Sequence, residues 1–79
     1  MNSHREGEYL CYGEAAKLSE HEFAAYYFVE HAPINGIKKC VLEKKRFGAD
    51  TYPTADLARL NAVSAGQMWG RNLADKKEI

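Results

Sequence analysis

With 79 residues the chain is expected to form a single domain, residues 1–79, and its hydrophobic content of 46% favours a folded globule over a disordered chain. The formal net charge is zero, which argues against a general basic field for nucleic acid. The longest apolar run, residues 23–29, is too short to span a membrane, and residues 1–9 lack the apolar core of a signal peptide. We therefore expect a cytoplasmic protein with no membrane partner.

The first part of the chain predicts a polar end followed by a short strand. Residues 1–7 are polar and end in a glycine, which is typical of a flexible tail. Residues 8–12 carry β-forming side chains and predict a strand. Residues 14–18 favour a helix by composition, but they are too few to form an isolated one.

Residues 22–31 are compatible with either a strand or a helix. A strand would separate two apolar sets on opposite faces, namely Phe23, Ala25, Tyr27 and Val29 on one and Ala24, Tyr26 and Phe28 on the other. A helix would be apolar on all sides and would begin with a capping box from Ser19 to Glu22. The aromatic residues favour the strand, and the helix stays open as the alternative.

A turn and a basic strand follow. Asn35-Gly36 predicts a two-residue type I′ turn, because both central positions of that turn need a positive φ. Residues 37–47 then form the returning strand, with lysines near both ends that suit an exposed edge. Regular alternation would put Cys40 and Leu42 on one face of this strand and Val41 and Phe47 on the other.

The strongest periodic pattern is a helix over residues 54–74. Thr54 is a suitable N-cap, and an apolar stripe of mostly small side chains follows at helical spacing: Ala58, Ala62, Ala65, Trp69 and Leu73. We expect this stripe to pack on the sheet with Trp69 buried, and residues 75–79 to be a second flexible tail. The predicted fold class is α+β, a three-stranded antiparallel sheet with one C-terminal helix packed on one face.

Charge is unevenly distributed along the chain. Residues 1–36 contain two basic and six acidic side chains, whereas residues 37–47 contain five basic side chains and one acidic one. Pairing of the basic strand with an acidic neighbour is the simplest interpretation. The candidate interaction surface combines two aromatic side chains with the basic ones: Tyr26, Phe28, Lys38, Lys39, Lys44, Lys45 and Arg46.

No residue pattern predicts a catalytic, cofactor-binding or metal site. Cys11 and Cys40 are the only cysteines, and in the cytoplasm we expect both to be reduced and buried. His21 and His31 have no second ligand at the spacing that zinc sites use. Glycine-rich phosphate-binding loops do not occur in the sequence. We therefore expect no enzyme activity.

Three short motifs resemble those of a group of small uncharacterised bacterial proteins. They are a Tyr-x-x-Tyr start at Tyr9–Tyr12, a Phe-Ala-Ala strand at 23–25, and a helix with Gly-x-x-Trp at Gly66–Trp69. Cys11 departs from this pattern, since such proteins often carry glycine there. The resemblance implies a β-β-β-α domain and transfers no functional residue.

The expected function is a non-enzymatic protein-interaction module. A small domain with many aromatic side chains outside its helix has more apolar surface than one helix covers, so the partner is either another protein or a second copy. A nucleic-acid-binding module that uses the basic strand is one alternative. An inhibitor of a host protein, carried by a phage or plasmid, is another, because such proteins have a similar size and layout.

Overall fold

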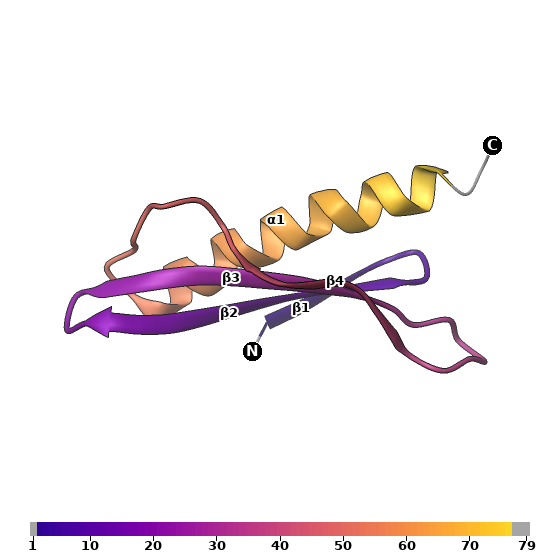
Figure 1. Cartoon of the computed structure of the whole chain (residues 1–79), viewed down its shortest axis with the longest axis horizontal. Coiled ribbons are helices and arrows are strands. Elements are labelled where there is room, and N and C mark those ends of the chain that lie inside the picture. The colour runs from indigo at the N-terminus through magenta and orange to yellow at the C-terminus, as the bar shows by residue number, and fades with distance from the viewer. Residues whose placement is uncertain (1, 77–79) are drawn as a thin grey trace.

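The computed structural model describes residues 2–76. Four strands precede one helix: β1 (Asn2–Glu6), β2 (Tyr9–Ser19), β3 (Glu22–His31), β4 (Lys39–Arg46) and α1 (Ala55–Lys76). The strands form one antiparallel sheet in the order β1-β2-β3-β4, and α1 lies along one face of it (Figure 1). The predicted α+β class with one C-terminal helix is confirmed, but the sheet has four strands instead of three.

The additional strand, β1, arises from the segment that was predicted to be a flexible tail. It pairs with β2 across the two-residue turn Gly7-Glu8, where Glu6 faces Tyr9. Gly7 has a φ of 59°, and within residues 2–76 only glycines have a positive φ. Positive φ at only the first central position is the pattern of a type II′ hairpin turn. The second predicted tail is also partly wrong, because α1 continues to Lys76; residues 77–79 lie outside the described residues.

Strand β2 is longer than predicted and contains the segment 14–18, whose composition favours a helix. It pairs with β3 from Tyr9–His31 to Ser19–Glu22, around a two-residue turn at 20–21. This cross-strand ladder supplies hydrogen bonds that an isolated short helix would lack, so tertiary pairing outweighs local preference. The boundaries 22–31 predicted for the next strand are those of β3, and its two faces are as predicted.

The connection between β3 and β4 differs from the predicted type I′ turn. It spans residues 32–38, and neither Asn35 nor Gly36 has a positive φ. Instead, the Gly36 amide donates a hydrogen bond to the Pro33 carbonyl at 3.2 Å. A Cβ atom on Gly36 would lie 2.5 Å from Pro33 Cγ, so the glycine allows a close approach of the proline ring. The expected edge position is confirmed, because β4 is the last strand of the sheet.

Helix and sheet approach each other closely because small residues meet at their interface. Ala58, Ala62 and Ala65 of α1 are buried, as the apolar stripe predicts. Gly13 of β2 lies directly under α1, where a Cβ atom would be 2.7 Å from the Val63 backbone nitrogen. A distance this short leaves room only for glycine at position 13, and together with the alanines of α1 it determines the distance between α1 and β2.

Cys11 occupies a second point of close approach. Its side chain is fully buried below Gly66 and Gly70, and a Cβ atom on Gly70 would lie 2.6 Å from the Cys11 sulfur. Two glycines inside α1 weaken the helix intrinsically. Here they accommodate the Cys11 side chain, which explains why the helix tolerates them.

Trp69 is not buried, contrary to prediction: 42% of its surface is exposed. The helix packs over β1, β2 and β3, and within residues 2–76 no Cα atom of α1 lies within 8 Å of a Cα atom of β4, so only side chains connect the two. Trp69 extends from the side of α1 that faces β3 and donates a hydrogen bond from Nε1 to the Tyr27 hydroxyl at 3.1 Å. Without a helix over β4, one side of the indole stays open to solvent.

The two cysteines are free thiols with opposite environments. Cys11 is buried as expected, but Cys40 is exposed, because it faces away from α1 on the edge strand. Desolvation raises the pKa of the Cys11 thiol above its usual value. The thiolate is the reactive form, so Cys11 combines poor access with a low thiolate fraction.

We predict that the native protein exposes one reactive thiol per chain. Titration with a chromogenic disulfide at mildly alkaline pH, in protein dilute enough that association does not shield the face away from α1, should modify Cys40 quickly and leave Cys11 unmodified until urea unfolds the chain. Cys40→Ser should abolish the fast reaction, whereas Cys11→Ala should leave it unchanged. Rapid modification of two thiols in the native state would contradict the buried position of Cys11.

Candidate protein-interaction surfaces

The face of the sheet opposite α1, here called the open face, carries a cluster of aromatic rings. The rings of Tyr12 and Phe28, from adjacent strands, stack with centroids 4.6 Å apart and planes 11° from parallel. Tyr26 lies on the same face of β3 as Phe28. All three side chains are half-buried. Within residues 2–76 the only helix lies on the other face, so none covers these rings (Figure 1).

Carboxylates and cations alternate around these rings. Glu14 of β2 forms an ion pair with Lys44 of β4. Arg46 faces Tyr26 across the β3–β4 pair. Desolvation raises the pKa of the Tyr12 hydroxyl above its usual value, and so does the hydrogen bond that this phenol donates to Glu30. The open face therefore combines apolar rings with charges of both signs.

The five predicted basic residues do not share one surface. Lys44 and Arg46 lie on the open face, because they are grouped with Glu14 and Tyr26. Lys39 and Lys45 pair with His31 and Tyr27, whose side chains are on the α1 side. Lys38 precedes β4, in the connection from β3. The predicted aromatic residues Tyr26 and Phe28 are brought together only with Lys44 and Arg46.

Two irregularities in the β3–β4 register produce this division. The ladder pairs Tyr27 with Lys45 but Val29 with Leu42, so β4 has an extra residue between these pairs. In an uninterrupted strand Leu42 would share its face with Lys44 and Arg46. The bulge instead places Lys45 on the α1 side with Leu42, so the alternation predicted for 37–47 is wrong.

A second surface, which sequence reasoning missed, forms around Tyr27 on the α1 side. We call it the Trp69 patch and define it by Leu42, Lys45, Phe47 and Trp69. The Phe47 and Tyr27 rings pack edge to face, with their centroids 6.3 Å apart. The Lys45 ammonium lies 5.8 Å from the centre of the Trp69 ring. Phe47 and Trp69 remain 38% and 42% exposed. The only sequence signal was the Trp itself, which we assigned to the core.

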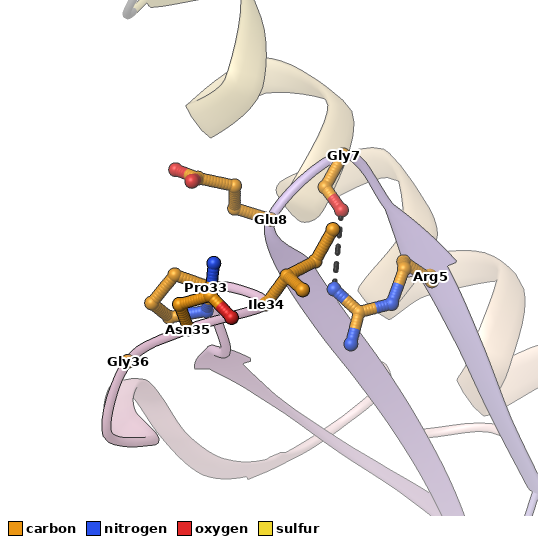
Figure 2. A pocket seen from close by; sticks show the side chains of 7 residues that line it. All are labelled: Arg5, Gly7, Glu8, Pro33, Ile34, Asn35 and Gly36. Carbon is orange, nitrogen blue, oxygen red and sulfur yellow. Dashed lines mark hydrogen bonds between the residues drawn. The ribbon is translucent and has the colours of Figure 1, made fainter.

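A depression lies between the β1–β2 turn and the loop after β3 (Figure 2). Arg5, Gly7, Glu8 and residues 33–36 line it. Arg5 donates hydrogen bonds to the carbonyl oxygens of Gly7, at 3.3 Å, and of Ala32, at 3.0 Å. Figure 2 shows the Arg5 and Glu8 side chains pointing in different directions. The polar groups here hold two loops together and do not converge on a ligand position.

Other titratable side chains are dispersed. His4 contacts Glu6 at 3.0 Å and His31 contacts Glu8 at 3.2 Å, on the exposed end of the sheet. Residues 2–76 contain no group of three or more His, Cys, Asp or Glu side chains that is arranged to hold a metal ion. In the same part of the chain, no helix has the length and apolar character needed to cross a membrane.

Comparison with protein-family models, with curated proteins and with solved structures finds no match to this chain. The resemblance to small bacterial β-β-β-α proteins therefore stays a prediction.

Proposed function

We propose that this chain is a non-enzymatic protein-interaction module that pairs with a second copy of itself through the open face. The stacked Tyr12 and Phe28 rings, with Tyr26 beside them, carry this proposal. Aromatic side chains contribute strongly to protein interfaces, because they bury a large area with few rotatable bonds. A two-layer domain whose single helix covers one face of the sheet leaves the opposite face for a partner.

The open face is suited to contact with an identical face. In a twofold interface residue i of one copy contacts residue j of the other and j contacts i, so a face that carries both charge signs can pair opposite charges with itself away from the axis. Glu14 and Glu30 supply negative charge, while Lys44 and Arg46 supply positive charge. The molecule measures 44 × 22 × 16 Å, and α1 and the sheet lie side by side when viewed down the shortest axis (Figure 1), so the open face is a 44 × 16 Å side. It presents on the order of 700 Å², close to the area of about 800 Å² per partner that specific interfaces bury.

The distribution of charge gives less support to nucleic-acid binding. Tyr12, Tyr26 and Phe28 would offer rings on which bases stack. However, the carboxylates of Glu14 and Glu30 lie among these rings, and Glu14 already pairs with Lys44. Phosphate groups would meet these negative charges, so a second copy fits the open face better than a nucleic-acid strand.

We predict that the protein sediments as a dimer at micromolar concentration, with twice the mass of the 8.9 kDa chain. The double substitution Tyr26→Ser and Phe28→Ser should shift the sedimentation coefficient to that of a monomer, since it removes two aromatic contacts from each copy. Because apolar association depends weakly on salt, the parent should remain dimeric when salt rises from about 50 to 200 mM.

Leu60→Ser is the matched control. This substitution also replaces an exposed apolar side chain by serine, but Leu60 lies on α1, away from the open face. It should leave the dimer intact. A monomeric parent, or a dimer that persists in the double variant, would refute the proposal. Saturable binding of oligothymidylate that disappears at the higher salt would favour the nucleic-acid alternative.

A further inference from the structure

The Trp69 patch has the composition of a binding surface and is separate from the open face. Trp69 is held in place by its hydrogen bond to Tyr27 and is still 42% exposed. Half-exposed tryptophans with a fixed orientation are frequent anchors of protein interfaces, because little conformational entropy is lost when they bind. Phe47 and Leu42 extend the apolar area along β4.

Strand β4 borders this patch with an unpaired outer edge. It is the last strand of the sheet, and in the described chain only β3 pairs with it. An unpaired edge offers backbone donors and acceptors to an added strand. The bulge in β4 turns Lys45 and Phe47 toward α1, and bulges commonly redirect side chains beside functional sites.

Charge determines which kind of segment this edge accepts. Residues 37–47 have five basic side chains and one acidic one, and within residues 2–76 only Lys44 of these five forms an ion pair with a carboxylate. Pairing of β4 with the β4 strand of a second copy would bring these like charges together, which is destabilising. An acidic strand would meet opposite charges along the same edge.

We propose that β4 and the Trp69 patch together bind an extended, acidic segment of a partner protein, whose acidic and apolar side chains share one face of the strand, at every second position. Its apolar side chains contact Trp69, Phe47 and Leu42. Its carboxylates lie near Lys39 and Lys45, which are on the same side of β4. This site does not use the open face, so it is independent of the proposed dimer.

Trp69 is the only tryptophan of the chain and therefore reports directly on this site. The test titrates the 79-residue chain with a capped peptide of sequence Glu-Ser-Val-Ser-Glu-Ser-Leu, whose acidic and apolar side chains share one face, and records tryptophan emission. The expected result is a saturable blue shift as the indole loses contact with water. A Lys-Ser-Val-Ser-Lys-Ser-Leu peptide should cause no saturable change, because it repeats the charge of β4.

Lys45→Glu should weaken peptide binding at least about fivefold, since an exposed charge pair is worth roughly 1 kcal/mol. Lys17→Glu, the same change on an exposed lysine of β2, should leave the dissociation constant unchanged. Dissociation constants are compared, because Lys45→Glu also alters the surroundings of the Trp69 ring. Equal binding of both peptides, equal effects of both variants, or a saturable response to oligothymidylate alone would overturn the proposal. Each of these results would leave the sedimentation test of the open face unaffected.

Discussion

Gly13→Ala should destabilise the fold by about 3 kcal/mol, which is a large part of the stability of so small a domain. The added methyl group would lie 2.6 Å from Val63 Cγ2, and 2.7 Å from the Arg59 carbonyl oxygen and the Val63 nitrogen. Two of these three atoms belong to the backbone of α1, so the clash is relieved only if the helix moves away from β2. Gly13 has no positive φ, so the cost is steric and not conformational.

Urea unfolding followed by far-ultraviolet circular dichroism measures this loss, with both proteins at one concentration so that any association is comparable. Ser19→Thr is the matched control. It also adds one methyl group to β2, but at an exposed position, and its stability should stay within about 0.5 kcal/mol of the parent. If Gly13→Ala unfolds at the urea concentration of the parent, α1 does not lie as close to β2 as the structure describes.

Gly70→Ala should have opposite effects in two backgrounds. In the parent it should cost about 1–2 kcal/mol, because the new methyl group would lie 2.6 Å from the sulfur of the fully buried Cys11. In a Cys11→Ala background the sulfur is absent, and the gain in helix propensity of up to about 1 kcal/mol should then dominate. Cys11→Ala alone should destabilise the protein, because it leaves a cavity below α1.

The double-mutant cycle gives the coupling between the two positions directly. We expect an interaction free energy of about 2 kcal/mol between residues 11 and 70. Gly66→Ala in the same two backgrounds is the comparison: its methyl group would be 3.2 Å from Cys11 Cβ, an atom that alanine retains, so removing the sulfur should change its cost less. Additive effects of Gly70→Ala and Cys11→Ala would show that Cys11 does not pack against Gly70.

The two candidate surfaces were predictable to different degrees. Alternation along β3 placed Tyr26 and Phe28 on one face, and the structure has them there. Tyr12, which stacks on Phe28, belongs to another strand, and its position depends on the β2–β3 register. The β2–β3 register is set by a two-residue turn at Glu20-His21, and neither residue is of a type that strongly predicts a hairpin turn. The register was therefore not predictable from the sequence. The Trp69 patch depends further on the bulge in β4, which no local pattern indicates.

Local patterns of the sequence determined the helix and the central strand. The residues 54–74 predicted for the helix correspond to α1 at Ala55–Lys76, because N-capping and 3.6-residue periodicity act within one segment. Strand β3 was equally predictable from alternation and aromatic content. The small residues of α1 also indicated a close helix–sheet contact, although not that Gly70 would lie on Cys11.

Only the tertiary structure decided the remaining features, because they depend on partners distant in sequence. Strand β1 exists because a β2 ladder is available to it, although its own residues predict a flexible end. Segment 14–18 is extended because β3 pairs with it. Trp69 is exposed because α1 lies over β1, β2 and β3 and leaves β4 uncovered, whereas Cys40 is exposed because the β3–β4 register turns it away from α1. Periodicity shows which side of a helix is apolar, but the strands beneath it determine how much of that side is buried.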